Sequence, residues 1–284
     1  MPGQVGQALV CVCLCVSVAI TNLIQIQRSL IVLKRLVLVI LCLSTLLSLF
    51  CCATTDSAKE EKDAEGVRRL GEGYLAEGNV TAALGQFLKA EEIYDKDPFL
   101  HYDLGLAYFG KEEFDLAISH FKRAVELDPD YSEAYNAMGR VHGRLEQWDM
   151  AISSFEEALS SLLYTTPHLA LNNLGEAYRH KKEYQRAIGY YKEALRKHPH
   201  FPNAYRGMGL TYMEMGDYKE AVASLEKAVQ YAPRSPRAYF DLGRAYAGLS
   251  ETKKAVSAFE KVRMLVPDTS LADRALSEIR RLGR

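Results

Sequence analysis

Cysteine is missing from the last 232 residues of this 284-residue chain, because all six cysteines lie between Cys11 and Cys52. A domain formed by residues 53–284 therefore contains no disulfide, no cysteine-ligated metal and no catalytic thiol. Such a domain is also compatible with an oxidising compartment. Acidic residues are missing at the other end: residues 1–52 contain three basic residues and no Asp or Glu. They carry +3, and the rest of the chain carries −4.

Motifs that carry catalysis are also missing. The sequence has no Gly-x-Ser-x-Gly nucleophile motif and no His-Glu-x-x-His metal-binding helix. Of the seven histidines only His198 and His200 are close in sequence, and no third ligand lies near them at metal-ligand spacing. Basic and acidic residues are interspersed, which gives no patch for nucleic acid. We therefore expect no enzymatic activity, no cofactor, no metal site and no small-molecule substrate.

What the sequence does contain is a period of 34 residues. Six glycines recur at intervals of 34 residues, with one interval of 36, and each follows an apolar residue directly. Within one unit, Tyr205, Gly209 and Tyr212 have the spacing of a single helix face. Because Gly is unfavourable inside a helix by about 1 kcal/mol, its recurrence indicates that two helix axes approach closely there. The glycines are Gly71, Gly105, Gly139, Gly175, Gly209 and Gly243.

The order Leu-Gly-x-x-Tyr, then Ala, then Pro, at this period resembles the tetratricopeptide repeat. The resemblance implies an all-α fold, a right-handed superhelical solenoid of six helix pairs whose concave face binds another protein. Gly216 is expected to turn the chain between the two helices of one pair. The predicted repeats cover residues 64–97, 98–131, 132–167, 168–201, 202–235 and 236–269, and a capping helix covers 270–284.

The first 52 residues have a different character. Lys34 and Arg35 precede an apolar run that ends at Cys51 and Cys52, which resembles a bacterial lipoprotein signal with Cys52 as the lipid-bearing residue. We interpret residues 1–31 as an over-extended gene start, and residues 53–63 as a polar tether. A transmembrane anchor is the alternative, because residues 36–53 make 18 mostly apolar positions and residues 8–20 form a shorter apolar run. The positive-inside rule exports the repeat domain in that case too.

A binding surface is expected on the first helix of each repeat, at positions 2, 5, 9 and 12, which line the groove in this repeat family. Four apolar residues on this face form a stripe in the second repeat, which we interpret as a partner anchor. The alternative is that the stripe packs on the neighbouring repeat or on the tether. The candidate groove residues are Phe99, Tyr102, Leu106, Phe109, Asn136, Arg140, Asn172, Arg179, Arg206, Leu210 and Met213.

The third repeat is two residues longer than the others, and its end reads Leu-Tyr-Thr-Thr-Pro over residues 163–167. This insertion, with six repeats behind a cysteine, resembles the type IV pilus biogenesis lipoproteins, the pilotins of the PilF and PilW type. The resemblance implies an outer-membrane lipoprotein that faces the periplasm, binds a secretin pore subunit and promotes its multimerisation. A scaffold or adaptor for another envelope machine is the alternative, and a repeat domain of a membrane-bound regulator is a third hypothesis.

We expect Cys52→Ser to abolish lipid attachment, because Cys52 ends the apolar run directly before the polar segment. Intact-mass measurement of the membrane-extracted protein should show a lipid-modified chain beginning at residue 52 for the wild type, and an unprocessed or released chain for the variant. A mature wild type that retains residues 36–51 would establish the transmembrane anchor instead. Loss of lipid in Cys51→Ser alone would move the assignment by one residue.

Overall fold

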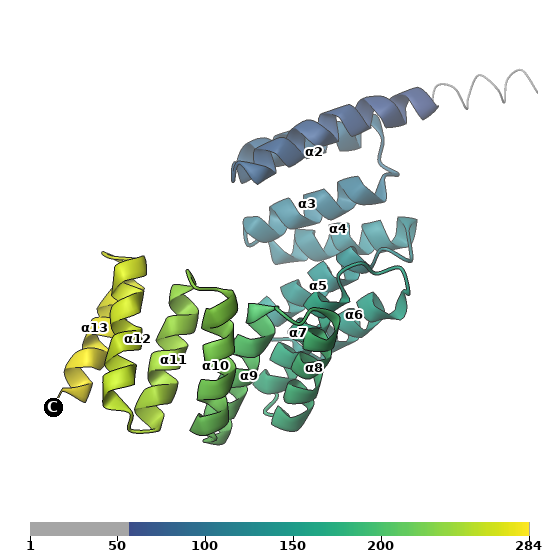
Figure 1. Ribbon diagram of the computed structural model, residues 1–284. Coiled ribbons are helices and arrows are strands. Elements are labelled where there is room, and N and C mark those ends of the chain that lie inside the picture. The colour runs from purple at the N-terminus through teal and green to yellow at the C-terminus, as the bar shows by residue number, and fades with distance from the viewer. Residues whose placement is uncertain (1–56, 284) are drawn as a thin grey trace, which may run out of the picture. The chain divides into compact units, whose positions relative to one another are not determined.

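The computed structural model describes residues 57–283, which consist of α-helices joined by short turns, without a strand (Figure 1). Residues 64–284 form one compact unit. None of the helices between residues 57 and 283 combines the length and apolar character that a membrane span requires. The predicted signal segment, the alternative anchor and Cys52 lie outside the described residues. The predicted all-α solenoid is confirmed.

Each predicted repeat contains two helices that pack against each other. Residues 57–76 are helical, so residues 57–63 of the predicted tether belong to the same helix as the start of the first repeat. The helices that follow are α2 (Val80–Ile93), α3 (Pro98–Gly110), α4 (Phe114–Leu127), α5 (Ser132–Arg144), α6 (Trp148–Ser160), α7 (Pro167–His180), α8 (Tyr184–Lys197), α9 (Pro202–Met215), α10 (Tyr218–Tyr231), α11 (Pro236–Gly248), α12 (Thr252–Leu265) and the capping helix α13 (Ser270–Leu282).

Proline marks the start of the first helix in four repeats. Pro98, Pro167, Pro202 and Pro236 occupy the first turn of α3, α7, α9 and α11, where a residue without an N–H group loses no hydrogen bond. The side chain of Asp97 caps α3 by accepting a hydrogen bond of 2.9 Å from the backbone N–H of Phe99. Pro98 therefore begins the second repeat rather than ending the first.

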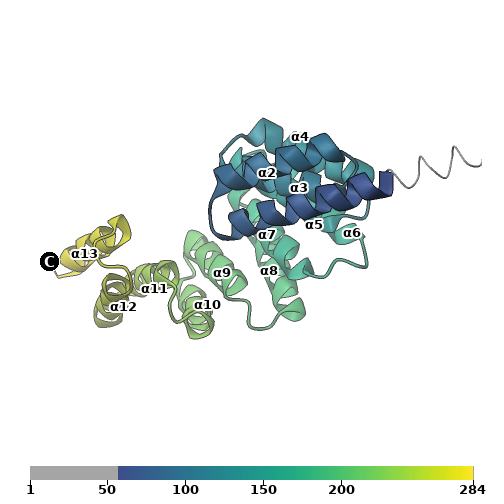
Figure 2. The ribbon, with the colours of Figure 1, turned by 90° about the horizontal axis from the view of Figure 1, so that it is seen from above.

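The helices stack in chain order, and the stack curves. The first helices of successive repeats contact one another, α3 with α5, α5 with α7, α7 with α9 and α9 with α11. Among the described residues, the second helices pack extensively only on the helices that precede and follow them. First helices therefore line the inner side of the curve. Seen from above, α2–α4 lie lengthwise whereas α10–α13 are seen nearly end-on, so the helix axes rotate along the stack (Figure 2).

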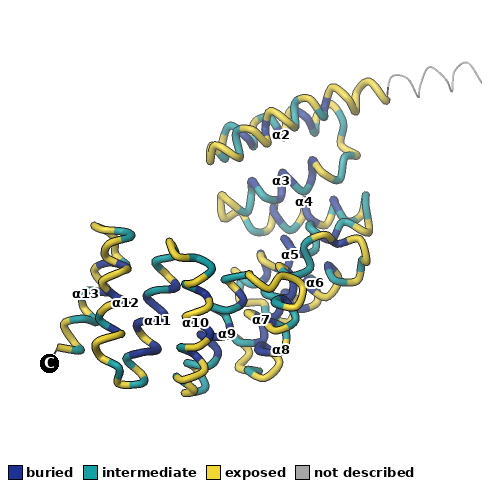
Figure 3. The backbone as a smooth tube through the Cα atoms, viewed as in Figure 1, coloured by how far each residue is buried: buried dark blue, intermediate teal, exposed yellow. Residues whose placement is uncertain are grey.

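Each of the six periodic glycines lies directly beneath a large side chain located 16 residues later in the sequence. A Cβ atom built on Gly105 would lie 2.5 Å from the ring of Phe121, far inside van der Waals contact. The pairs are Gly71 with Phe87, Gly105 with Phe121, Gly139 with Phe155, Gly175 with Tyr191, Gly209 with Leu225 and Gly243 with Phe259. Buried residues accordingly follow the faces along which helices meet (Figure 3).

The turn between the two helices of a pair contains one residue in the left-handed region. Gly78 and the predicted Gly216 occupy it in the first and fifth repeats, with φ of 79° and 83°. The other four repeats place a non-glycine residue there, with φ between 59° and 63°: Glu112, Glu146, Lys182 and Ser250. A left-handed conformation costs a residue with a Cβ atom about 1 kcal/mol. The repeat geometry thus imposes this turn even where the sequence does not favour it.

We expect Gly175→Ala to destabilise the protein, because its new Cβ atom would lie 2.6 Å from the Tyr191 ring. Overpacking of this kind costs about 1–3 kcal/mol. Gly189→Ala in α8 is the matched control, since no atom lies within 4 Å of its Cβ position. An exposed helical Gly→Ala change stabilises by up to about 1 kcal/mol. Urea unfolding followed by circular dichroism gives the free energy of unfolding of each variant. Equal stability of the two variants would refute the close-contact role of Gly175.

Candidate protein-binding surface

The inner face of the solenoid is crossed by polar contacts that join each first helix to the next. Arg206 Nε lies 2.6 Å from Asp241 Oδ2, which links α9 to α11. Asn173 Nδ2 donates to Asn136 Oδ1 over 3.0 Å, which links α7 to α5. These side chains satisfy one another across the junctions between repeats. They join the repeats on the same face of the first helices that the sequence predicts to bind a partner.

Three predicted groove residues thus already have partners within the solenoid. Asn136 is buried, and its amide is a contact between helices rather than a free hydrogen-bonding group. Arg206 and Arg179 are paired, the latter with Glu214 at 2.5 Å. The sequence could not show this, because each acceptor lies 35 residues further along, in the next repeat. An acidic ligand that binds Arg179 or Arg206 would first have to displace Glu214 or Asp241, which lowers its affinity.

Arg68 forms the densest charge cluster on this face. Its guanidinium group lies 2.5 Å from Glu72, 3.1 Å from Asp97 and 3.1 Å from Asp103. Asp103 is buried, and burial raises the pKa of its carboxyl group to about 7, although the hydrogen bond from Arg68 opposes the shift. One guanidinium group thus contacts three carboxyl groups that come from the first repeat and the start of the second.

The apolar stripe of the second repeat is mostly part of the packed core. Phe99 is 50% exposed. Tyr102, Leu106 and Phe109 are half-buried and pack against a cluster that α4 and α5 form. The Tyr102 ring centroid lies 5.1 Å from that of Tyr131, which directly precedes α5. These three side chains thus contribute to the packing of the solenoid, and their role as a partner anchor stays a prediction. Part of this packing is on the neighbouring repeat, because Ala137, Met138 and Val141 of α5 belong to the cluster.

Of the remaining predicted residues, only Arg140 is exposed. Its guanidinium carbon lies 5.2 Å from the centroid of the Phe109 ring. Asn172, Leu210 and Met213 are half-buried. Phe99 and Arg140 are thus the two candidates that the structure leaves exposed on the first helices, one on α3 and the other on α5.

The insertion between the third and fourth repeats exposes two residues that sequence reasoning missed. Leu162 and Leu163 are 101% and 83% exposed, whereas the adjacent Tyr164 is 8% exposed and packs with Ala158 and Ala170. Tyr164 therefore anchors the loop, and the two leucines project from it. The available signal was a pair of leucines beyond the last periodic residue of a helix, where no core position remains.

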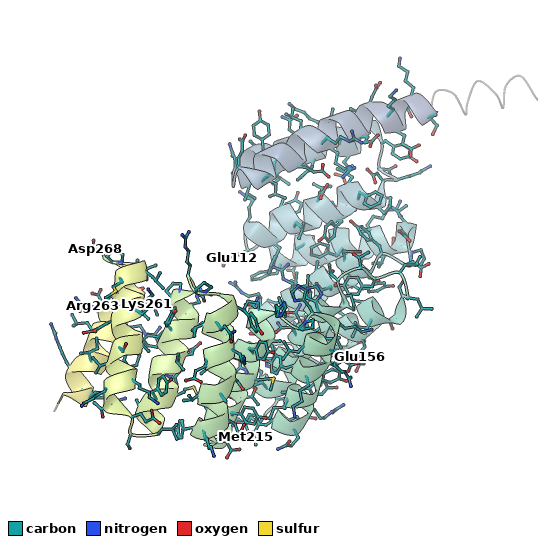
Figure 4. The ribbon with its side chains drawn as sticks, viewed as in Figure 1. Glu112, Glu156, Met215, Lys261, Arg263 and Asp268 are labelled. Carbon is teal, nitrogen blue, oxygen red and sulfur yellow. The ribbon has the colours of Figure 1, made fainter. Side chains whose placement is uncertain are left out.

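Two further features involve residues outside the predicted groove set. An open hollow on α11 and α12 is lined by Tyr239, Tyr246 and Lys261, among others. Figure 4 shows Lys261 and Arg263 near the end of α12, with Asp268 beyond it. Separately, α2, α3 and α4 bring together Glu91, His101 and His120, although sequence spacing predicted no metal ligands among the histidines. The three residues come from three different helices, so no local sequence motif predicts that they lie together.

Comparison with family models finds tetratricopeptide repeats along most of the solenoid. Models described as "Tetratricopeptide repeat" match residues 98–131, 136–200 and 178–223. A model described as "TPR repeat" matches residues 209–250. A search of curated proteins finds no match. The family matches and the helix pairs agree on the repeat type.

Solved structures with the same fold include two proteins of pilus biogenesis. PilW, described as a widely conserved type IV pilus biogenesis factor, is 20% identical with a TM-score of 0.69, over 75% of this chain and 98% of PilW. PilF of Pseudomonas aeruginosa is 21% identical with a TM-score of 0.66, over 78% of this chain and 99% of PilF. Cut9 in the APC/C heterotetramer Cut9–Hcn1 is 18% identical with a TM-score of 0.67, over 78% of this chain and 43% of the other. At these identities the shared property is the fold.

We expect the double variant Tyr102→Ala, Phe109→Ala to lower the stability of the solenoid, because both rings pack against α4 and the Tyr102 ring also packs against Tyr131. Truncating one half-buried aromatic ring costs on the order of 2 kcal/mol. Phe99→Ala is the control on the same helix and should lose much less, because its ring is half exposed. Thermal unfolding followed by circular dichroism gives the unfolding temperatures of the double variant and of Phe99→Ala for comparison. If the double variant is as stable as Phe99→Ala, the Tyr102 and Phe109 rings do not contribute to the packed core.

Proposed function

Because the chain is a tetratricopeptide-repeat protein, we propose that it is a protein-binding scaffold of the bacterial envelope that assists assembly of a type IV pilus secretin. Tetratricopeptide repeats are protein-interaction scaffolds, since their stacked helix pairs offer a long continuous surface. Secretin binding, the envelope location and a lipid anchor at Cys52 belong to the proposal. Under it, the protein catalyses no reaction.

Two observations support the pilus assignment. The likeness to PilW and PilF extends over nearly the whole length of both proteins, so that this chain contains a solenoid of the same extent. The sequence insertion that resembles this lipoprotein family is also a distinct structural feature here. It forms the loop over residues 161–166 between α6 and α7, with Tyr164 buried beneath it.

The exposed pair Leu162 and Leu163 is the observation that carries the proposal. An adjacent pair of almost fully exposed leucines is costly in water, and burial of each leucine against a partner yields roughly 1.5–3 kcal/mol. The buried Tyr164 anchors the loop next to the pair, so the two leucines are presented at a defined place on the surface. The loop is therefore suited to capture an apolar segment of another protein.

A membrane anchor would strengthen this interaction without adding contacts. A lipid at Cys52 would hold the solenoid near the bilayer into which a pore subunit inserts. Confinement of both proteins to one surface raises the effective concentration of each for the other. The predicted anchor and the exposed loop thus serve the same step, delivery of secretin subunits to a membrane.

We expect the double variant Leu162→Ser, Leu163→Ser to reduce secretin multimers at least 10-fold, because it removes the larger part of the apolar area that the loop offers. The measurement is the ratio of multimeric to monomeric secretin in membranes of cells that express the variant from its own locus. Met264→Ser is the matched control, since Met264 is a 72% exposed apolar residue in α12. Normal multimers in the double variant, or equal loss in the control, would contradict the proposal.

A further inference from the structure

A cluster of metal-ligand type lies where the first two repeats meet. Glu91 comes from α2, His101 from α3 and His120 from α4, and their ligand atoms all lie within 4.8 Å of one another. His101 Nδ1 is 3.2 Å from His120 Nδ1. Glu91 Oε1 is 3.8 Å from the first of these nitrogens and 3.9 Å from the second. Three ligand atoms thus surround one point.

The tautomer of His101 is fixed by its other nitrogen. His101 Nε2 lies 2.8 Å from the backbone carbonyl oxygen of Asp95. A carbonyl oxygen only accepts hydrogen bonds, so Nε2 carries the proton and Nδ1 presents a lone pair to the centre of the cluster. A metal-bound histidine is usually held in this way, by a hydrogen bond from its second nitrogen to a carbonyl or carboxylate.

The ring of His120 is held by stacking. Its centroid lies 5.3 Å from that of Tyr108, with 12° between the planes, and 5.5 Å from that of His101. His101 has a side-chain exposure of 5% and His120 of 17%, whereas Glu91 reaches 30%. The two nitrogens are thus rigidly placed, and the carboxylate side of the cluster is open to solvent for a water ligand.

The dimensions suit a tetrahedral transition metal. Bonds of about 2.0–2.1 Å to each ligand place neighbouring ligand atoms about 3.3 Å apart. The two nitrogens already have this separation, and the Glu91 carboxylate has to move by only about 0.5 Å toward them. Imidazole nitrogens favour Zn²⁺ over Mg²⁺ or Ca²⁺, which prefer oxygen ligands.

We propose that Glu91, His101 and His120 bind one Zn²⁺ ion, with water as the fourth ligand, and that this ion links the first repeat to the second. Glu91 belongs to the first repeat, and both histidines belong to the second. The link matters because repeats of a solenoid contact only their neighbours, so an end repeat is held from one side alone. The competing interpretation is a plain hydrogen bond between two histidines, which needs no metal.

The test is Zn²⁺ titration of the membrane-extracted protein in detergent, after alkylation of any free cysteine to prevent thiol binding; every cysteine of the chain lies within residues 11–52. Isothermal titration calorimetry should show one Zn²⁺ per chain. Saturating Zn²⁺ should raise the unfolding temperature by several degrees, because a ligand of the folded state stabilises it. Mg²⁺ at the same concentration should have no effect.

Glu91→Gln and His120→Gln should each weaken Zn²⁺ binding at least 10-fold and remove the thermal shift. Glu91→Gln keeps the side-chain shape, so it should fold like the wild type without Zn²⁺. The double variant His198→Gln, His200→Gln is the control, because these exposed histidines form the closest pair in the sequence. Equal Zn²⁺ binding by Glu91→Gln and the wild type would overturn the proposal, as would loss of binding only in the control.

Discussion

The close approach of two helices at a glycine is the constraint on which the rest of the structure depends. In each repeat, the side chain 16 residues after the glycine occupies the space that a Cβ atom would fill. This contact fixes the separation of the two helices, and the separation fixes the surface that the pair offers to the next repeat. Because every repeat obeys the same rule, the inner face continues from α3 to α11, although the side chains on it differ.

The inner face has a dual role, because the residues that join the repeats also line the groove. Arg68 with Asp103 and Arg206 with Asp241 occupy corresponding positions in two different junctions. Both aspartates are buried, and burial raises the pKa of each, with the facing arginine opposing the shift. These charges help to set the stacking of first helices. The accessible binding surface is therefore smaller than the groove itself, which makes the exposed leucines of the insertion more prominent.

The sequence predicted the repeats because close packing within each helix pair requires a small residue at one fixed position. It failed where contacts cross between repeats. The packing of Phe109 depends on Arg140 in the next repeat, and that of Asn136 depends on Asn173 in the next repeat. The cluster of Glu91, His101 and His120 needs three helices at once. The insertion was recognised from its length, but the burial of Tyr164 and the exposure of Leu162 depend on how the longer loop folds back.

The proposed partner site and the proposed metal site lie at different junctions of the solenoid. Glu91, His101 and His120 join the first repeat to the second, whereas Leu162 and Leu163 project between the third and the fourth. In a stack whose units contact only their neighbours, a perturbation at one junction is largely confined to it. Effects at distant sites without shared contacts usually add. Zn²⁺ would therefore stabilise the first repeat without changing the loop, and each site can be examined in a protein whose other site is intact.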